Sequence, residues 1–373
     1  MKILTFNSIS PLAAQTLGDA YTLSDNIDSP EAIMLRAYKL TDYVFPKSVK
    51  IVTRCGAGVN NIPTDRCAEE GIIVCNTPGA NANAVKELVL SSLFMCGRRI
   101  IPAINWVQGT KDGETTVQDQ VEKGKSKFVG HEITGKTLGI IGLGGIGKKV
   151  AVAAMALGMK VLYFEARDVT ADADYPQGVT NVTLQQLYQD SDFITIHVPL
   201  LDSTRGMINA TTIATMKDGV NIINIARGEL VADDDIITAV KSGKVNRYCT
   251  DFPNAKLLGI DGIVTTPHLG ASTPEAEDNC AVIAAEVIKE FNVNKNVVFS
   301  VNFPSLSMAT KGHAVLALFK GDGEQFAQVG KSWKLHNFQI KSNGKFGVAK
   351  FDFKEAVSAD IFANINGILR IYM

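Results

Sequence analysis

The sequence has almost no net charge, which removes one class of partner at the outset. Its 37 Lys and Arg residues are balanced by 38 Asp and Glu residues, so the formal charge at pH 7 is −1 over 373 residues. Such a balance gives no electrostatic argument for binding nucleic acid or an acidic membrane surface. No nucleic acid partner is expected, and small-molecule chemistry becomes the default expectation.

Cysteine pairs and long apolar runs are also missing. The six cysteines include no Cys-x-x-Cys pair and no Cys/His set at metal-binding spacing, so they predict small buried residues in a reducing compartment and no metal site. No stretch approaches the length of a membrane span, and the first residues lack the apolar run of a signal peptide. The sequence therefore predicts a cytoplasmic protein with no membrane partner.

What the sequence does contain is a glycine-rich turn in a distinctive setting. Thr137–Ile141 has the composition of a buried strand, and residues 146–157 have helical spacing. Between them lie the three glycines of a Gly-x-Gly-x-x-Gly motif: Gly142, Gly144 and Gly147. The first glycine permits a tight turn, the second lets the backbone approach a pyrophosphate, and the third lets the helix pack on the strand. The free N–H groups of the helix N-terminus would then face the phosphates of a dinucleotide.

An acidic residue closes the next predicted strand. The run Lys160–Glu165 has the composition of a strand, and it places its final carboxylate at roughly the twenty-residue spacing of the dinucleotide fingerprint. A carboxylate at this position accepts hydrogen bonds from both ribose hydroxyls and repels a 2′-phosphate. The pattern therefore favours NAD over NADP. NADP stays open as the alternative, because Arg167 is a cation two residues after Glu165.

Strand and helix patterns alternate along most of the chain, as they do in parallel sheets. In the first hundred residues the strand-like runs are Lys2–Phe6, Ala32–Leu35, Val49–Thr53 and Ile72–Cys75. After Glu165 the pattern continues with residues 193–199, 220–226, 248–251 and 263–267. The sequence thus predicts an α/β fold with two doubly wound parallel-sheet domains, the second of which is a Rossmann domain.

Chemically distinctive residues follow several of these strands, which is where ligands bind in open α/β sheets. Arg227 comes directly after an apolar strand and before a glycine, where a charge is costly unless it meets an anion. His268 follows another strand end, and its spacing alone leaves a structural hydrogen-bonding role open. Residues 54–61 can point several backbone N–H groups at one anion beside Arg54, with a simple glycine turn as the alternative.

Three further motifs accompany the glycine fingerprint in the same chain: Arg54–Asn61, Asn224–Gly228 and Pro267–Thr273. The combination resembles the D-isomer-specific 2-hydroxyacid dehydrogenases over about residues 1–305. Within that family, the resemblance is greatest to the members that oxidise 3-phospho-D-glycerate to 3-phosphohydroxypyruvate, the first step of serine biosynthesis. The resemblance therefore implies an NAD-dependent oxidoreductase whose partners are these two small molecules.

The resemblance also implies a domain organisation. A flavodoxin-like substrate-binding domain is split between residues 1–97 and 276–305, and residues 98–275 form the NAD-binding Rossmann domain, with the active site between them. Residues 306–373 have the pattern strand, helix, hairpin, helix, strand, which predicts a small ferredoxin-like α+β domain and resembles the ACT domains of many family members. The loop after its first strand lacks the residues of a serine site, so we expect a structural or dimerising domain without serine inhibition.

By the same resemblance, individual residues take the family's roles. Arg227 binds the carboxylate and carbonyl oxygens of the substrate, and His268 is the acid/base that exchanges the hydroxyl proton while hydride passes to the nicotinamide. The rest of the substrate is bound by backbone N–H groups and by two phosphate-binding cations: Ala57, Gly58, Val59, Arg54 and Lys39. The NAD cofactor is bound by Gly142, Gly144, Gly145, Ile146, Gly147, Glu165, Val198, Ala226, Asp251 and Gly270.

One departure from the family pattern concerns His268. In the family, a glutamate that orients the histidine follows the Asp251 position after a short spacing, but residues 251–256 contain no glutamate here. Either His268 acts without a carboxylate partner or another group supports it, with Asn254 and Asp251 as candidates.

Two alternatives stay open for the whole chain. One is another D-2-hydroxyacid dehydrogenase, against which only the Arg54 loop and the C-terminal segment argue. The other is a non-catalytic NAD(H)-binding regulator. The presence of both Arg227 and His268 favours catalysis, because a sensor of NAD needs neither. The expected assembly is a homodimer through the nucleotide domain, or a higher homo-oligomer.

Overall fold

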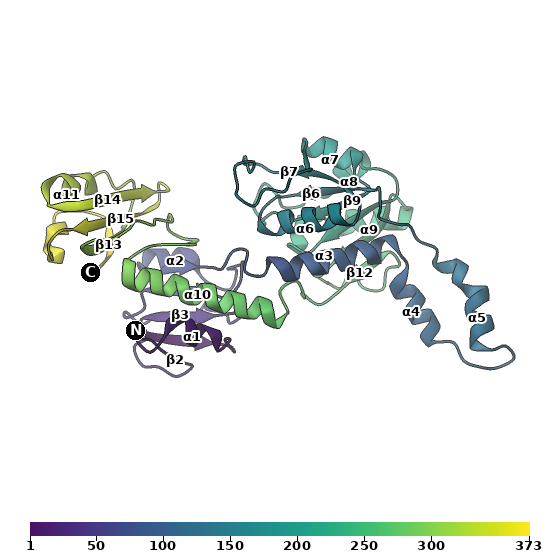
Figure 1. Cartoon of the computed structure of the whole chain (residues 1–373), viewed down its shortest axis with the longest axis horizontal. Coiled ribbons are helices and arrows are strands. Elements are labelled where there is room, and N and C mark those ends of the chain that lie inside the picture. The colour runs from purple at the N-terminus through teal and green to yellow at the C-terminus, as the bar shows by residue number, and fades with distance from the viewer. The chain divides into compact units, whose positions relative to one another are not determined.

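The computed structural model describes residues 1–373, and the chain divides into two compact units. The first unit joins Met1–Asn81 to Thr273–Met373, and the second is the continuous segment Ala82–Ser272. Figure 1 labels the helices and strands of both. The chain thus leaves the first unit after Asn81 and returns to it at Thr273.

A five-stranded parallel sheet lies at the centre of the N-terminal part of the first unit. Its strands are β1 (Lys2–Phe6), β2 (Thr22–Ser24), β3 (Ala32–Leu35), β4 (Ile51–Arg54) and β5 (Ile73–Cys75). They lie in the order β2-β1-β3-β4-β5, which is the flavodoxin-like order and confirms the predicted fold class. The edge strand β2 was not predicted, because its three residues carry a single apolar side chain.

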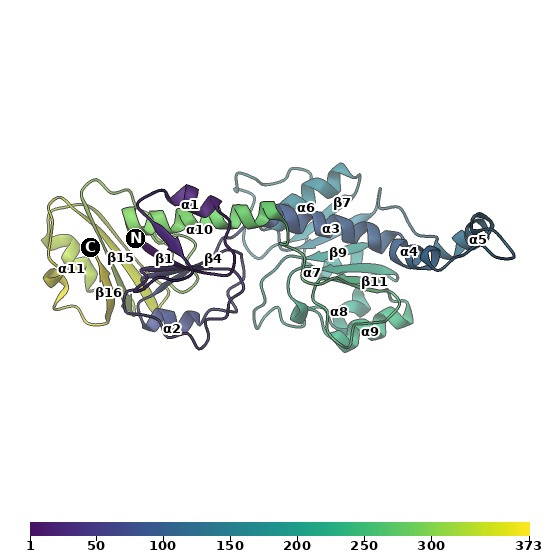
Figure 2. The ribbon, with the colours of Figure 1, turned by 90° about the horizontal axis from the view of Figure 1, so that it is seen from below.

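Helices cover both faces of this sheet (Figure 2). α1 (Leu12–Leu17) and the long α10 (Pro274–Asn294) pack together on one face, and α2 (Thr64–Glu69) lies on the other. The sequence specifies the start of α10, because Thr273 accepts a hydrogen bond from the Ala276 N–H at 3.1 Å and a proline occupies the first helical position.

The second unit contains a seven-stranded parallel sheet. Its strands are β6 (Thr137–Ile141), β7 (Lys160–Phe164), β8 (Thr180–Asn181), β9 (Phe193–Ile196), β10 (Val220–Asn224), β11 (Val245–Thr250) and β12 (Ile263–Thr265). The order β12-β11-β10-β9-β6-β7-β8 changes direction at β6, as in a Rossmann fold, and this confirms the predicted architecture. Because all neighbouring strands are parallel, their carboxyl ends lie along one edge of the sheet.

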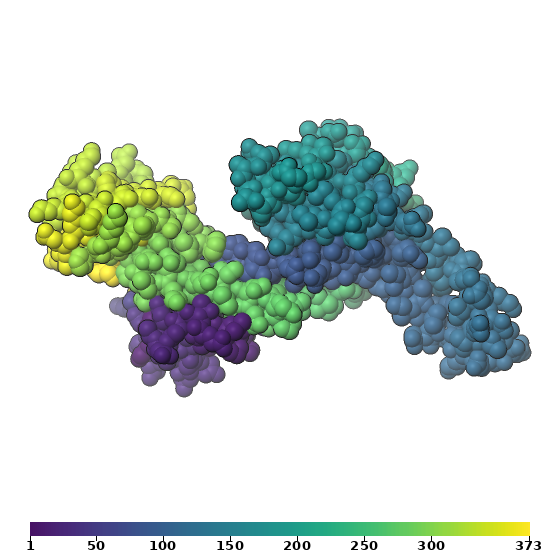
Figure 3. Space-filling view, in the orientation of Figure 1, coloured from purple at the N-terminus to yellow at the C-terminus, as the bar shows by residue number.

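Helices also pack on both faces of the second sheet. One face carries α3 (Ala82–Gly97) and α6 (Gly145–Ala156), and the other carries α7 (Leu184–Asp190), α8 (Ala210–Thr215) and α9 (Asp233–Ser242). α4 (Ile100–Gln108), α5 (Val117–Gly124) and a 3₁₀ turn at Lys125–Phe128 form an arm that extends from this unit (Figure 3). None of the helices is both long enough and apolar enough to cross a lipid bilayer.

The C-terminal part of the first unit is a four-stranded antiparallel sheet. Its strands β13 (His313–Lys320), β14 (Leu335–Ser342), β15 (Phe346–Phe353) and β16 (Ile368–Tyr372) lie in the order β14-β15-β13-β16. With α11 (Phe326–Ser332) between β13 and β14, this is the predicted ferredoxin-like topology. A second helix was expected between β15 and β16, but that connection forms only a 3₁₀ turn at Ala359–Phe362, which Ser358 caps.

Both faces of this C-terminal sheet are buried along its central strands β13 and β15. Leu316, Leu318 and Tyr372 join the core formed with α10, while Phe319 and Phe351 pack with α11 on the opposite face. Every residue of β15 is buried in consequence. The C-terminal sheet therefore shares a hydrophobic core with the N-terminal sheet of its unit. The predicted three-domain boundaries and the resemblance to ACT domains stay predictions.

Candidate active site

Three chemically distinctive residues of the second unit follow neighbouring strands. Arg227 follows β10, Asp251 follows β11, and His268 lies just beyond β12. These strands are adjacent and parallel, so the three residues lie side by side at the carboxyl edge of the sheet. The glycine turn follows β6, which is separated from β10 only by β9. The fold thus brings the predicted catalytic pair and the predicted cofactor turn to the same edge of one sheet.

Each glycine of the fingerprint meets the steric demand expected of it. Gly142 has φ +96°, and a side chain there would come within 2.7 Å of the His197 carbonyl oxygen. A Cβ on Gly147 would lie 2.1 Å from the Gly142 carbonyl oxygen, so α6 can pack here only without a side chain. A Cβ on Gly144 would meet no atom within 4 Å, so the turn is open where a phosphate would approach.

The first turn of α6 supplies the predicted phosphate donors. Gly144 is the residue before the helix, and Gly145 and Ile146 occupy its first two positions. The N–H groups at the start of a helix have no acceptor within the helix, and the helix dipole favours an anion beside them. The Gly145 backbone is exposed, which leaves these donors accessible.

Glu165 is fixed by the backbone around this turn. Its carboxylate accepts hydrogen bonds from the N–H groups of Leu143 and Ala166, each at 2.9 Å. Arg167, which left NADP open, forms two hydrogen bonds to Asp172 at 2.7 and 3.1 Å, and this pairing lowers the pKa of the Asp172 carboxyl. The arginine is therefore engaged by a carboxylate, and the site favours a ribose without a 2′-phosphate.

Val198 and Ala226 lie at the ends of β9 and β10. A Cβ on Gly142 would contact the Val198 side chain at 3.0 Å, so Val198 lies against the glycine turn. Ala226 donates its N–H to Asn224 Oδ1 at 3.2 Å, and Asn224 Nδ2 donates to the Arg227 carbonyl at 2.8 Å. The buried Asn224 side chain therefore shapes the turn that carries Arg227. The sequence did not indicate this role, although a buried amide at the end of an apolar strand was the available signal.

Asp251 is buried, and only one of its two carboxylate oxygens has a hydrogen-bond partner. Its Oδ2 accepts a hydrogen bond from the Gly270 N–H at 3.0 Å, while Oδ1 is buried without a partner. Burial raises the pKa of this carboxyl, and the Gly270 N–H and the charges of His268 and Arg227 oppose that rise. An orphaned buried acceptor calls for a donor from a ligand. The amide of a nicotinamide ring is such a donor, so the site fits NAD. Gly270 is itself buried, and its N–H holds the Asp251 carboxylate in place.

His268 is exposed, and its ring packs against Phe252 with the centroids 4.7 Å apart. Asn254, one candidate for supporting the imidazole, is engaged elsewhere. Its Nδ2 donates to Asp233 at 2.9 Å, and its Oδ1 accepts a backbone N–H of the following turn at 2.9 Å. Of the two candidates in place of the family's glutamate, Asp251 is the one whose charge interacts with His268.

The predicted substrate loop of the first unit follows β4. Arg54 is the last residue of this strand, and its Nε donates to the Arg36 carbonyl at 3.2 Å. Its guanidinium lies over Gly56, where a Cβ would come within 2.2 Å of Nη1. Gly56 has φ +145° and donates its N–H to the Thr77 hydroxyl at 2.8 Å. Only glycine at position 56 is compatible with this placement of Arg54.

The backbone of Ala57, Gly58 and Val59 is available to a ligand. None of their N–H groups donates to an acceptor in the protein, and none of the three residues is buried. Successive free N–H groups in a turn form a concavity that binds anions. Lys39 is exposed after β3, and neither a hydrogen bond nor an ion pair fixes its side chain.

The cysteines and the remaining histidines form no metal-binding cluster. No group of three or more His, Cys, Asp or Glu side chains is arranged to hold a metal ion. All six cysteines are buried and unbridged. His197 lies beside the glycine turn, where burial lowers its pKa to about 3, and its Nε2 hydrogen-bonds to the Thr195 hydroxyl at 3.0 Å. It therefore stays neutral and has a structural role.

Residues 92–270 match the family model for the NAD binding domain of the D-isomer specific 2-hydroxyacid dehydrogenases. This range contains every predicted cofactor residue and both predicted catalytic residues. The chain therefore carries the family's NAD-binding domain, and NAD is its cofactor.

Curated relatives differ in the reaction for which they are named. The hydroxypyruvate reductase of Thermotoga maritima is 39% identical over 257 residues, which cover 66% of this chain and 79% of the relative. The D-3-phosphoglycerate dehydrogenase of Bacillus subtilis is 35% identical over 295 residues, and that of Homo sapiens is 32% identical over 320 residues. These two matches cover 76% and 84% of this chain, which spans only 53% and 58% of the relatives' length.

Solved structures share the fold across most of the chain. A glyoxylate reductase from Paecilomyes thermophila has a TM-score of 0.67 at 26% identity, covering 80% of this chain and 98% of its own. The NAD⁺-bound 3-phosphoglycerate dehydrogenase of Entamoeba histolytica has a TM-score of 0.63 at 26% identity, covering 82% of this chain and 99% of its own. With the family model and the Thermotoga relative, these matches show that the chain belongs to the D-isomer-specific 2-hydroxyacid dehydrogenase family.

Proposed function

We propose that this chain oxidises 3-phospho-D-glycerate to 3-phosphohydroxypyruvate with NAD, the first step of serine biosynthesis. The observation that supports this choice of substrate is the loop after β4, where the Arg54 guanidinium lies over Gly56 and the next three residues have free backbone N–H groups. The substrate has two anionic groups, and this loop offers N–H donors for a carboxylate and a cation for a phosphate. Several D-3-phosphoglycerate dehydrogenases among the relatives support the same choice.

The proposed mechanism assigns a separate task to each residue. Arg227 binds the substrate carboxylate and the oxygen on C2, and the N–H groups of residues 57–59 bind the carboxylate as well. NAD supplies the hydride acceptor. His268 takes the hydroxyl proton on an imidazole nitrogen as the C2 hydrogen leaves as hydride, and it returns the proton in the reverse reaction. Arg54 and Lys39, which belong to the first unit, are proposed to bind the phosphate of the same substrate.

Reduction of unphosphorylated hydroxypyruvate is the second candidate. The Thermotoga relative named for that reaction is 39% identical, and the chain covers 79% of it. Hydroxypyruvate has no phosphate, so the two candidates differ in whether Arg54 contributes to substrate binding. A regulator that binds NAD(H) without turnover differs from both, because it needs neither Arg227 nor His268.

Turnover of a panel of 2-oxo acids tests the proposal. NADH oxidation is measured with phosphohydroxypyruvate, hydroxypyruvate, pyruvate, 2-oxoglutarate and glyoxylate, on the wild type and on Arg54→Ala. We expect phosphohydroxypyruvate to be preferred and its kcat/KM to fall about tenfold in the variant. This is the lower end of what a charged hydrogen bond contributes, about 1.5–3 kcal/mol, because Lys39 is proposed to share the phosphate.

The unphosphorylated substrate is the internal control in this panel. For hydroxypyruvate, kcat/KM should be the same in the wild type and in Arg54→Ala. A preference for hydroxypyruvate that survives in the variant would assign the second candidate. Bound NADH without turnover of any 2-oxo acid would favour the regulator.

We further propose that Asp251 takes over part of the role of the missing glutamate. Its Oδ2 accepts the N–H of Gly270, two residues after His268, and its negative charge acts on the imidazole. Phe252, the next residue, packs against the imidazole ring. Asp251 therefore fixes the loop that carries His268. It is a positioning residue for the acid/base, in addition to its proposed contact with the nicotinamide.

Asp251→Asn keeps the size of this side chain and removes its charge. We expect kcat for phosphohydroxypyruvate reduction to fall about tenfold, because a neutral amide accepts the Gly270 N–H more weakly than the carboxylate does and holds the loop that carries His268 less firmly. Asp233→Asn, which removes the partner of Asn254, is the control. A loss of kcat in the control and none in Asp251→Asn would assign the supporting role to Asn254.

We propose that the chain forms a homodimer through α4, in the arm of the second unit. No residue of α4 is buried, and three of its large apolar side chains are exposed to solvent: Ile100 at 40%, Ile104 at 53% and Val107 at 40%. Their spacing places all three on one face of the helix, which is the pattern of an apolar stripe that packs against a partner. A second copy of the same arm presents a matching stripe, as a two-fold interface requires.

Ile104→Glu places a charge in the middle of this stripe. By light scattering after size exclusion, the wild type should have twice the mass of one chain and the variant the mass of one chain, with unchanged circular dichroism. Leu258→Glu is the control, because Leu258 is an exposed leucine elsewhere in the same unit, and this variant should stay dimeric. A dimeric Ile104→Glu would place the interface elsewhere.

A further inference from the structure

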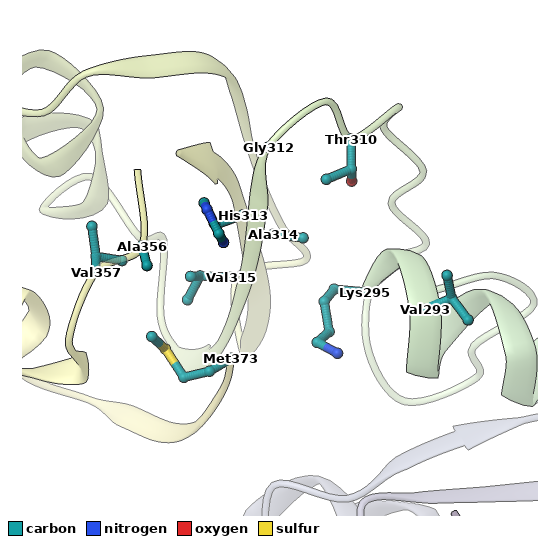
Figure 4. Close-up of a pocket in the computed structure, with 10 residues that line it drawn as sticks. All are labelled: Val293, Lys295, Thr310, Gly312, His313, Ala314, Val315, Ala356, Val357 and Met373. Carbon is teal, nitrogen blue, oxygen red and sulfur yellow. The ribbon is translucent and has the colours of Figure 1, made fainter. Parts of the chain in front are cut away.

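A cavity of about 340 Å³ lies between the end of α10 and the C-terminal sheet of the first unit (Figure 4). Val293 and Lys295 line it from the end of α10, and His313 and Val315 line it from β13. Most of the remaining lining is apolar: Ala314, Ala356, Val357 and Met373. The volume lies at the lower end of the range for ligand pockets, roughly 300–1,000 Å³, so it suits a small molecule.

The wall of the cavity before β13 is held in place by buried polar groups. Asp352 is 1% exposed and accepts hydrogen bonds from the N–H groups of Lys311 and Gly312, each at 2.8 Å. Lys350 is fully buried and donates to the Met308 carbonyl. The segment cannot collapse into the cavity without breaking these hydrogen bonds. The cavity is therefore preformed, which lowers the cost of ordering it around a ligand.

Lys295 places an uncompensated cation at one side of this cavity. It ends α10 with φ +56°, a left-handed conformation that is unfavourable for residues other than glycine. Its ammonium makes one hydrogen bond, to the Asn292 carbonyl at 2.7 Å, and no Asp or Glu pairs with it. Burial lowers its pKa, and the charge of Lys50 lowers it further. A bound anion would therefore compensate for the desolvation of this ammonium.

Two more polar groups line the same space. The Thr310 hydroxyl is buried without a hydrogen-bond partner in the protein, an arrangement that is unfavourable for a polar group. The His313 imidazole projects from the start of β13 (Figure 4). Thr310 stands on the same side of β13 as Lys295, and the His313 side chain stands on the other side of that strand (Figure 4). The cavity thus combines one cation, two further hydrogen-bonding groups and an apolar interior.

We propose that this cavity binds a small organic anion, namely a carboxylate with a short branched aliphatic body. The carboxylate pairs with the Lys295 ammonium, because lysine acts as a point charge for anions. The aliphatic body lies against Val293, Val315 and Met373. Thr310 is placed to bind a second polar group of such a ligand. None of these residues takes part in the proposed dehydrogenase reaction, so the cavity can be tested without turnover.

Isothermal titration calorimetry on the full chain tests the proposal. The probe is 4-methylpentanoate, which has no 2-oxo or 2-hydroxy group for a dehydrogenase to act on. We expect saturable binding at one site per chain, and at least tenfold weaker binding of the neutral 4-methylpentanamide. Lys295→Met should weaken binding of the acid at least tenfold. Lys331→Met, at an exposed lysine of α11, is the matched control and should bind like the wild type.

A second variant separates loss of the cation from a change at the end of α10. Ala356 is an exposed residue of the lining, so Ala356→Trp should fill the cavity without disturbing the core. Loss of binding in both variants, with an unchanged unfolding temperature in Ala356→Trp, supports the proposal. Binding that survives in both variants, equal binding of acid and amide, or no binding up to about 10 mM overturns it.

Discussion

His268→Asn is expected to lower kcat for phosphohydroxypyruvate reduction by about 10²–10⁴-fold, the contribution of a positioned general acid/base. The imidazole is exposed at the carboxyl edge of the second sheet, just beyond β12, the strand next to the one that Asp251 follows. Asparagine keeps a polar side chain but cannot take or return the proton. NADH affinity should stay unchanged, because the glycine turn follows β6 and Glu165 follows β7, both distant from β12 in the strand order.

The absorbance of NADH measures kcat, and the fluorescence of bound NADH measures its affinity, so the two quantities are obtained separately. His131→Asn is the matched control in the same unit. His131 is exposed, and its hydrogen bond to the Gly97 carbonyl uses its backbone N–H. The control should keep wild-type turnover. An unchanged kcat in His268→Asn would exclude His268 as the acid/base, and an equal loss in both variants would mean that the effect is not specific to this residue.

The cofactor turn was predictable because its demands are local. The positive φ of Gly142 and the contact between Gly147 and the Gly142 carbonyl arise within a few residues, and glycine alone satisfies them. The environment of His268 was not predictable in the same way. Gly270 was expected at the cofactor, but its N–H bonds to Asp251, which follows a different strand. Such a contact depends on how two loops pack, and no local sequence pattern specifies that.

The arm of the second unit shows a similar limit at the level of the fold. Residues 110–130 are polar and rich in lysine, a composition that predicts only an exposed connection, yet they contain α5. The local signal was Thr116, which caps the helix by accepting the Asp119 N–H at 3.1 Å. The rest of its support is tertiary, because Gly124 packs so closely on the Trp106 ring that a Cβ would lie 2.3 Å away. A polar segment gives no periodic apolar signal for such packing.

Strand β15 was predicted, but the burial of both its faces was not. Lys350 and Asp352 alternate with apolar residues along the strand, which is the pattern of a face exposed to solvent. In the structure that face joins the core with α10, so both side chains are buried. Alternation specifies which residues share a face of a sheet, but it does not specify what covers that face. The consequence is a buried lysine in the middle of the first unit.

Lys350 has no exposed surface and no carboxylate at ion-pair distance. Its ammonium donates to Asn296 Oδ1 at 2.6 Å and to the Met308 carbonyl. Burial lowers its pKa to about 8, whereas an unfolded lysine has a pKa of about 10.4. The charged groups that act on it are Asp352 on β15, Glu290 on α10 and Lys295 at the end of α10. The two carboxylates favour the charged ammonium, and the second lysine opposes it.

We expect the free energy of unfolding to rise by about 2 kcal/mol more in the wild type than in Lys350→Met between about pH 8 and pH 10. In this window the folded chain releases the Lys350 proton while the unfolded chain holds it. Stability therefore rises with pH, because the unfolded state binds more protons. Urea unfolding at several pH values measures the difference, with the exposed Lys354→Met as control. A flat difference would mean that Asp352 and Glu290 compensate for burial and keep Lys350 protonated in the folded state.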